Sequence, residues 1–141
     1  MGAEETFALC EKTLRYQDVP SFLQQLEDAL RGQEYMDADQ FGIRLACQEA
    51  LDNSHQHGNG NDPLKTIHVQ YRVDGQEFFI RITDQGIGFD PASVPDPTKL
   101  ENLEKPSGRG LLLMRRYMEE VLFVGHVGNV VEMRRRRIIQ R

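Results

Sequence analysis

Three polar side chains follow one another at four-residue intervals in the segment EALDNSHQHGN, residues 49–59. On an α-helix, Glu49, Asn53 and His57 would form one stripe, because residues four apart are offset by only about 40°. The stripe borders the apolar arc of the same helix, so we expect it to line a crevice beside the core. Glu49 is suited to act as a general base. The amide oxygen of Asn53 is a suitable ligand for Mg²⁺ that phosphates already hold.

A second motif, DQGIGFDP, occupies residues 84–91 directly after an apolar, strand-like segment. Asp84 would stand at the mouth of the core, where its carboxylate can accept a hydrogen bond from the amino group of adenine. Gly86 and Gly88 permit positive φ angles and allow a ligand to approach the backbone. Because an Asp-x-Gly turn is common in proteins, this motif indicates a nucleotide only in the company of the others.

The third motif, GRGLLLM at residues 108–114, opens a helix with two glycines. Exposed amides at a helix N-terminus bind phosphate readily, and Arg109 either meets phosphate oxygens or faces solvent in a turn. The chain contains neither G-x-x-x-x-G-K-S/T nor G-x-G-x-x-G, the two common glycine-rich nucleotide motifs. Its four histidines and two cysteines have no zinc spacing. An acid, an amide and glycine loops around one site therefore favour a nucleotide with its metal.

Hydrophobic periodicity predicts the elements that hold these motifs in place. We expect a strand over 5–14, helices over 19–33 and from Asp37 or Asp39 to about His57, strands over 66–73 and 78–83, a helix from Ser107 to about Glu120, and a final hairpin of 121–126 and 130–136. Residues 89–107 contain four of the six prolines and little periodicity, which is typical of a lid. This order predicts an α/β two-layer sandwich, in which about three helices cover one face of a mixed, mainly antiparallel sheet.

The length and charge of the chain limit its possible functions. At 141 residues it is expected to form a single domain, residues 1–141, with its core at about 5–136. Its 17 Lys and Arg stand against 22 Asp and Glu, a net charge of −5, whereas a nucleic-acid surface needs a basic face. One run is basic, from Arg134 to Arg137, and for it a solvated strand end or tail is favoured over a nucleic-acid patch.

The cysteines and the apolar segments indicate the compartment. Cys10 and Cys47 are far apart and need no disulfide, which favours a reducing compartment. Cys47 falls on the apolar side of its predicted helix, as a small buried hydrophobe would. The N-terminus has no signal-peptide pattern, and no stretch approaches the ~20 apolar residues of a membrane span. We therefore expect a cytoplasmic protein with no membrane partner.

Taken in order, E-x-x-x-N, D-x-G-x-G and G-x-G-L resemble the N, G1 and G2 boxes of the gyrase, chaperone, histidine-kinase and mismatch-repair (GHKL) ATPase superfamily. Within it, EALDNSHQHGN, DQGIGFDP and GRGLLLMRRYMEEV are similar to the small anti-sigma-factor serine/threonine kinases. The resemblance covers about 5–136. It implies a Bergerat-type α/β sandwich that binds ATP with Mg²⁺, phosphorylates a serine on an anti-anti-sigma antagonist and sequesters a sigma factor. It also implies a homodimer.

By motif position, the resemblance implies a role for each of the polar residues. Glu49 would be the general base, Asn53 the Mg²⁺ ligand and Asp84 the adenine-binding residue. His57 matches a position usually held by histidine in this branch and, with Arg109, belongs to the expected cofactor-binding set. The remaining members are the glycines that would shape the phosphate loops, namely Gly86, Gly88, Gly108 and Gly110.

Two departures from the superfamily pattern bear on function. Gln56 stands where histidine kinases often carry a basic residue, which disfavours a histidine kinase. The final hairpin often carries Gly-Thr beside the adenine, and this chain has Gly128-Asn129.

Three functions are open from the sequence. The first is a kinase that acts on a small partner protein, and Glu49 favours it because a chain that had lost catalysis could lose this residue. The second is a binding module that sequesters a partner, with or without ATP, and does not phosphorylate it. The third is an ordinary α/β domain in which the motifs occur by chance.

Overall fold

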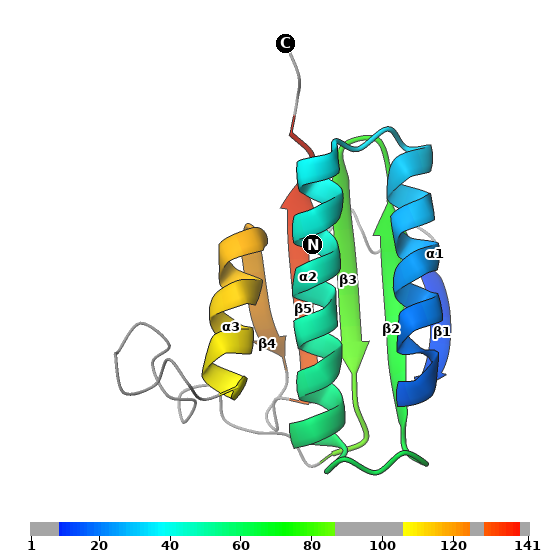
Figure 1. Ribbon diagram of the computed structural model, residues 1–141, viewed down its shortest axis with the longest axis vertical. Helices are drawn as coiled ribbons and strands as arrows, with labels where there is room; N and C mark the ends of the chain where they lie inside the picture. Colours follow the sequence, from blue (N-terminus) through cyan, green and yellow to red (C-terminus); the bar gives the residue numbers. More distant parts are fainter. Residues whose placement is uncertain (1–8, 87–105, 125–128, 139–141) are drawn as a thin grey trace.

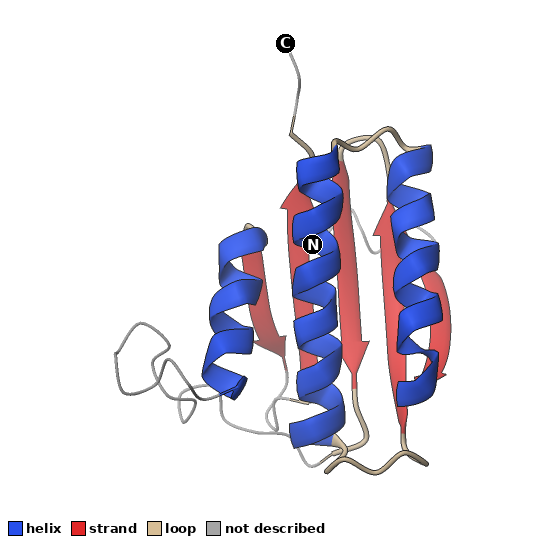
Figure 2. Cartoon of the chain, viewed as in Figure 1, coloured by secondary structure: helices blue, strands red, loops and turns tan. Residues whose placement is uncertain are grey.

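The computed structural model describes residues 9–86, 106–124 and 129–138 of the chain. Five strands form one sheet in the order β1-β2-β3-β5-β4, and every pairing between these described strands is antiparallel. The three α-helices lie side by side on one face of this sheet (Figures 1 and 2). This arrangement confirms the predicted two-layer sandwich. The elements are β1 (Cys10–Arg15), η2 (Tyr16–Asp18), α1 (Val19–Gly32), α2 (Asp37–Asn53), η3 (Ser54–Gly58), β2 (Thr66–Val73), β3 (Glu77–Thr83), α3 (Pro106–Tyr117), β4 (Glu120–Val124) and β5 (Val130–Arg136).

The second helix is shorter than its sequence pattern predicts. The pattern predicts an α-helix to about His57, but α2 ends at Asn53 and a π turn, η3, follows. The Asn59 N–H donates to the Ser54 carbonyl at 2.8 Å, five residues back. A turn closed by i→i+5 bonds holds more residues than an α-helical turn. Glu49 and Asn53 are half-buried whereas His57 is exposed, so the crevice-lining stripe predicted from the sequence does not extend to His57.

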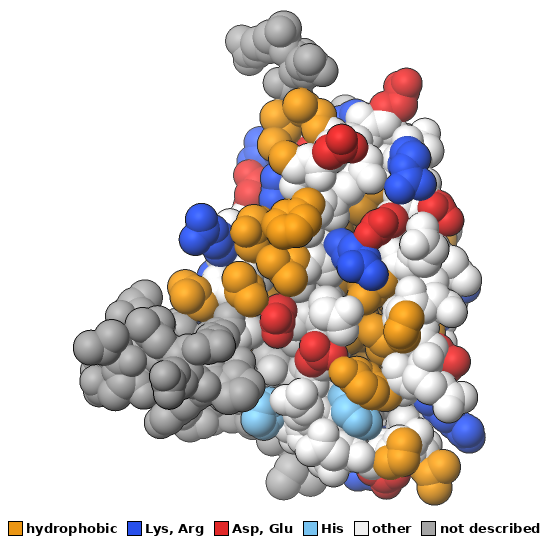
Figure 3. Space-filling model, viewed as in Figure 1, with side chains coloured by type: hydrophobic (Ala, Val, Ile, Leu, Met, Phe, Trp, Pro, Cys, Tyr) orange, Lys and Arg blue, Asp and Glu red, His pale blue; other side chains and the backbone are white. Residues whose placement is uncertain are grey.

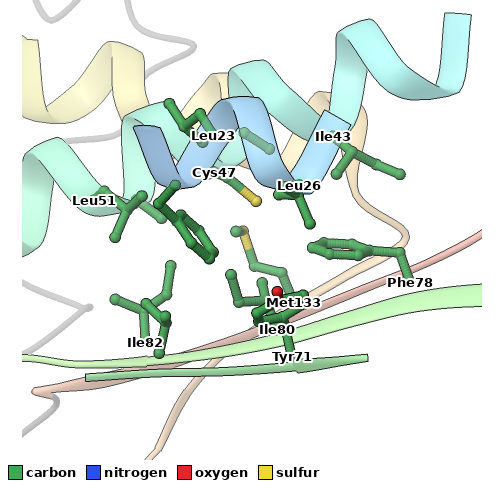
Figure 4. Packing of buried hydrophobic residues seen from close by; sticks show 14 of the residues in the cluster. Leu23, Leu26, Ile43, Cys47, Leu51, Tyr71, Phe78, Ile80, Ile82 and Met133 are labelled. Carbon is green, nitrogen blue, oxygen red and sulfur yellow. The ribbon is translucent and has the colours of Figure 1, made fainter. Parts of the chain in front are cut away.

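The core lies between the sheet and the helices, and Figure 4 shows its centre. Apolar residues at helical spacing on α1 and α2 face alternate residues of the strands, as amphipathic helices and half-buried strands require. Cys47 lies in this core with no exposed surface, and burial raises the pKa of its thiol, whereas Cys10 on the edge strand β1 is exposed. Residues with 0% exposure include Leu23, Leu26, Ile43, Leu51, Ile67, Ile80, Ile82 and Met133.

Arg134, Arg135 and Arg137 of the basic run are part of the fold rather than a solvated strand end or tail, whereas Arg136 is exposed. Arg134 donates to Glu77 at 2.9 Å and lies 4.9 Å over the ring of Phe79. Arg137 donates to the carbonyls of Gly75 and Glu34. The fold therefore uses charges that the sequence pattern leaves to solvent.

Arg135 has the most buried partner of the run. Strand alternation places Arg135 on the side of Val131 and Met133, facing the helices. Its guanidinium donates to Asp39 Oδ1 at 2.6 Å and to the Tyr117 carbonyl at the end of α3 at 2.8 Å. Asp39 has no exposed surface and accepts a second bond from the Ile138 N–H at 2.8 Å. This buried pair joins the start of α2, the end of α3 and the end of β5.

On the helical side of the molecule, charges of both signs and apolar side chains are interspersed over the described surface (Figure 3). On this side, the described residues therefore form no continuous basic face of the kind that phosphate backbones require. None of the described helices combines the length and the apolar character that a bilayer crossing needs.

Candidate functional site

The first and third sequence motifs meet where α3 packs against the C-terminal half of α2. A Cβ atom added at Gly110 would lie 3.3 Å from Glu49 Oε2 and 3.2 Å from Asn53 Nδ2. Both side chains are half-buried, one helical turn apart on α2. Glycine at 110 thus lets the start of α3 approach a carboxylate and an amide. The expected grouping of acid, amide and glycine helix start is present in the structure.

The second motif is held at the end of β3 by the strand beside it. The Asp84 N–H donates to the Asn129 carbonyl at 3.1 Å, and Asn129 Nδ2 donates to the Asp84 carbonyl at 3.1 Å. These bonds extend the β3–β5 ladder one residue beyond Thr83 and Val130. Asp84 Oδ1 accepts a bond from the Gly86 N–H at 2.8 Å. The backbone on both sides of the carboxylate is therefore fixed.

A pocket connects the motifs. Asp84, Asn53 and Asn129 all line it, and Asn129 directly precedes β5. The rest of its wall includes the apolar residues Ala50, Met114, Phe123, Val130 and Val131, together with Ser54. A largely apolar wall with a few convergent polar groups is the usual composition of a small-molecule site. The cavity volume is about 10 Å³, room for roughly one water molecule, so an aromatic ring enters only if the walls of the pocket move apart.

Both carboxylates of the site are harder to ionise than exposed ones. Burial raises the pKa of Asp84 above its ordinary value, although the hydrogen bond from Gly86 opposes the shift. Burial, followed by the negative charge of Asp52, raises the pKa of Glu49. A higher pKa makes an ionised carboxylate a stronger proton acceptor, which suits a general base.

The structure also places the other residues predicted for the site. His57 is exposed in η3, whereas the neighbouring His55 is buried and stacks on Tyr16 with ring centroids 3.9 Å apart. Gly108 and Arg109 lie in the first turns of α3, which begins at Pro106. Gly88 and positions 89–105 of the expected lid lie outside the described residues.

Two residues to which the three motifs assign no role contact the Asp84 segment. A Cβ atom added at Gly58 would lie 2.1 Å from Asp84 Oδ2, so the glycine packs directly on that carboxylate. Asn59, 1% exposed, donates from Nδ2 to the Thr66 carbonyl and accepts from the Gln85 N–H. In the sequence both belong to a Gly-Asn run that signals a helix end. Nothing local indicates their contacts with Asp84 and Gln85.

A second network fixes α2 from its other side. The Tyr16 hydroxyl donates to Asp52 Oδ1 at 2.6 Å, and Gln48 Nε2 donates to the same oxygen at 3.0 Å. The bond to Asp52 raises the pKa of Tyr16 to about 12. These contacts link the η2 turn to the segment that carries Glu49 and Asn53.

The donor set fits a nucleotide-bound cation better than a protein-held metal. No three His, Cys, Asp or Glu side chains within the described residues are grouped to hold an ion. Mg²⁺ commonly binds through one or two protein oxygens plus substrate phosphates. Asn53 Oδ1 would be the protein oxygen for such a cation, and it lies beside Gly110, where an added Cβ would be 3.5 Å away.

Comparison with known proteins places these features in a family. The model of the histidine kinase-like ATPase domain matches residues 13–135. An anti-sigma F factor of Anoxybacillus flavithermus (strain DSM 21510 / WK1) is 31% identical over 96 residues, 64% of this chain and 65% of the relative. Another, from Oceanobacillus iheyensis, is 32% identical over 82 residues, 56% of each chain. A third, from Geobacillus sp. (strain WCH70), is 30% identical over 88 residues, 60% of each chain.

The chain thus spans about three fifths of the length of the curated relatives it matches. The matches confirm the resemblance that the three motifs indicate. Because the domain model covers most of the chain, this protein belongs to the histidine kinase-like ATPase domain family, a membership that implies ATP binding.

Proposed function

We propose that this protein is an ATP-dependent serine/threonine protein kinase and anti-sigma regulator, which phosphorylates a small anti-anti-sigma-type antagonist and sequesters a sigma factor. The observation that carries the proposal is the approach of Gly110 to both Glu49 and Asn53, beside the pocket that Asp84 lines. This arrangement brings together a candidate general base, Glu49, a candidate metal ligand, Asn53, and a carboxylate that could recognise adenine, Asp84. The name of the matched relatives, anti-sigma F factor, supports the choice of partner.

Each side chain has one role in this proposal. Asp84 accepts a hydrogen bond from the adenine amino group, while Met114 and Phe123 cover the ring. Asn53 coordinates Mg²⁺ through its amide oxygen, and Gly110 leaves room for the phosphates. Bound ATP with Mg²⁺ supplies the phosphoryl group and stabilises charge, so the protein contributes mainly positioning. Glu49 accepts the proton of the partner's serine hydroxyl, and its raised pKa suits this task.

The alternative is an ATP-binding module that sequesters its partner and does not phosphorylate it. It is favoured by the limited extent of the similarity, since the relatives' name states an anti-sigma role and no catalytic one. The two functions differ in whether phosphate reaches the partner.

The deciding experiment identifies the protein that co-purifies with this chain and incubates the two with γ-labelled ATP and Mg²⁺. Label on a serine of the antagonist supports the kinase. A stable complex with no label, from protein shown to bind ATP, leaves the sequestering module. Absence of ATP binding would contradict both.

Asp84→Asn is expected to weaken ATP binding and to stabilise the nucleotide-free protein. A hydrogen bond to a charged group contributes about 1.5–3 kcal/mol, so the Kd should rise by about ten- to 150-fold. Because the folded-state pKa of Asp84 is raised, its ionised form lowers stability at neutral pH, and this cost disappears as pH falls through that pKa. The thermal midpoint of the variant should therefore exceed that of the wild type at pH 7, with the gap closing in acid.

Calorimetry with ATP and thermal melts at several pH values measure the two effects. Asp28→Asn, an exposed carboxylate on α1, is the matched control and should change neither. Equal ATP affinity in Asp84→Asn and the wild type would remove Asp84 from the nucleotide site.

A homodimer in the cytoplasm completes the proposal. Within the described sheet, β1 and β4 are the edge strands, and an edge strand is a place where a second copy can add to the sheet. Light scattering at high concentration that returns the chain mass of 16.2 kDa would contradict the dimer.

A further inference from the structure

Gly58 packs against the Asp84 carboxylate, and Gly86, from the loop after β3, packs against the backbone of Gly58. A Cβ atom at Gly58 would lie 2.1 Å from Asp84 Oδ2 and 2.2 Å from its carboxyl carbon. A Cβ at Gly86 would lie 1.9 Å from the Gly58 carbonyl oxygen. Real Cβ atoms do not come so close to other atoms. The η3 turn, the carboxylate and the loop after β3 thus fit together only with glycine at both positions.

Asn59 ties the same segments together through its side chain. Its Nδ2 donates to the Thr66 carbonyl at 3.0 Å, and its Oδ1 accepts from the Gln85 N–H at 2.8 Å. Gln85 Oε1 in turn accepts from the Thr66 N–H at 2.7 Å. Asn59 is 1% exposed, and a buried amide with these bonds is costly to disturb. The residue after Asp84 is therefore fixed to the residue after Gly58 and to the first residue of β2.

The π turn makes this arrangement possible. Its i→i+5 bond from Asn59 N–H to the Ser54 carbonyl lies directly beyond Asn53, the last residue of α2. The turn thus connects Asn53, the candidate Mg²⁺ ligand, to Gly58, which contacts Asp84, within a few residues. π turns inside helices are frequent at functional sites.

We infer that Gly58 and Asn59 are positioning residues for the base-recognising carboxylate: Gly58 leaves the space that Asp84 Oδ2 occupies, and Asn59 fixes the loop that carries Asp84. They set nucleotide-base selectivity without touching the nucleotide. This inference rests on the proposed contact between Asp84 and the adenine amino group. It extends the candidate site to two residues on η3 and at its end.

The test compares two nucleotides on one protein sample. Purine riboside triphosphate is ATP without the 6-amino group, so it cannot donate to Asp84. The wild type should bind ATP at least about tenfold more tightly than this analogue, as expected for a hydrogen bond to a charged group. In Gly58→Ala the new Cβ displaces the carboxylate, and the preference should fall below about threefold. The ratio of two Kd values from one sample is independent of the fraction of folded protein.

Controls separate positioning from general damage. Gly32→Ala makes the same substitution where a Cβ meets nothing within 4 Å, and its ratio should match the wild type. Asn59→Ala tests the second residue and serves alone if Gly58→Ala does not fold. It too should lose the preference for ATP, because the loop is released. A merely structural role would weaken both nucleotides equally and leave the ratio unchanged.

The outcomes distinguish this inference from the proposed function. A folded Gly58→Ala or Asn59→Ala protein that keeps the wild-type ratio overturns the positioning role, while the adenine contact of Asp84 stands. A wild type with equal affinity for the two nucleotides overturns the adenine contact itself, and the positioning role with it. If the wild type and Gly32→Ala prefer ATP over the analogue and the Gly58 and Asn59 variants do not, the result supports both the adenine contact of Asp84 and the positioning role.

Discussion

Glu49→Gln is expected to lower serine phosphorylation of the partner by about 10²–10⁴-fold and to leave the Kd for ATP nearly unchanged. Glutamine keeps the size and hydrogen bonding of the side chain but cannot accept the hydroxyl proton. Burial and the charge of Asp52 raise the pKa of Glu49, so the wild-type rate should fall as pH decreases through that raised pKa. The variant lacks this titration, and the acid limb of its pH profile should be absent.

The same experiment separates Glu49 from its neighbour one turn along α2. Asn53→Ala should lose both phosphorylation and ATP affinity, because Asn53 would hold the cation that accompanies ATP. Glu34→Gln, an exposed glutamate between α1 and α2, is the matched control and should behave as wild type. Rates and Kd values for all three variants are measured in parallel. A Glu49→Gln protein that phosphorylates at the wild-type rate would leave the sequestering module as the better proposal.

Arg135→Met is expected to cost about 3–5 kcal/mol of unfolding free energy, a large part of the stability of a typical domain. Methionine retains the apolar stem of the side chain but removes the guanidinium. Asp39, with no exposed surface, then loses its cationic partner and keeps the Ile138 N–H as a remaining donor. The Tyr117 carbonyl at the end of α3 also loses its donor.

Urea unfolding measures this loss as a fall in the midpoint at constant slope. The neighbouring Arg136 is 80% exposed and lies 4.0 Å from Glu119, so Arg136→Met should change stability by less than about 0.5 kcal/mol. Adding Asp39→Asn to Arg135→Met removes the buried charge and should recover part of the loss. Equal midpoints for the two arginine variants would show that the buried pair does not stabilise the fold.

Local periodicity was sufficient to place most elements of the fold. The sequence predicts a strand at 66–73 and a helix at 19–33, and the structure has β2 at Thr66–Val73 and α1 at Val19–Gly32. These elements bury one face along their whole length, so their periods are clear. Boundaries set by distant contacts were less accurate. The helix predicted to reach about Glu120 ends at Tyr117, where Arg135 binds its last carbonyl.

The motifs located Glu49, Asn53, Asp84 and Gly110 because each motif is local and its chemistry is visible in a few residues. They assigned His57 to the site, and the structure places it exposed in η3, whereas His55 is buried. The burial of His55 depends on Tyr16, far away in the chain, which stacks on it. Roles that exist only through tertiary contacts are invisible to local patterns.

The pair of Arg135 and Asp39 did leave a signal in the sequence. Alternation along the last strand places Arg135 on the same face as Val131 and Met133. Helical spacing places Asp39 near the apolar arc of α2 that includes Ile43. Two opposite charges at inward positions of neighbouring elements indicate a buried pair, because an unpaired charge there would be very costly.

Because Cys10 is exposed and Cys47 is buried, the reactivity of Cys47 can report local unfolding of the helical layer. Cys10 is exposed on an edge strand and will react with a thiol reagent in the native state, whereas Cys47 is enclosed between α2 and the sheet. Its raised pKa further reduces the thiolate that such reagents need. Once Cys10 is blocked, the rate of modification at Cys47 measures how often the helices separate locally from the sheet. Nucleotides and partners that hold α2 against α3 will slow that rate without any added label.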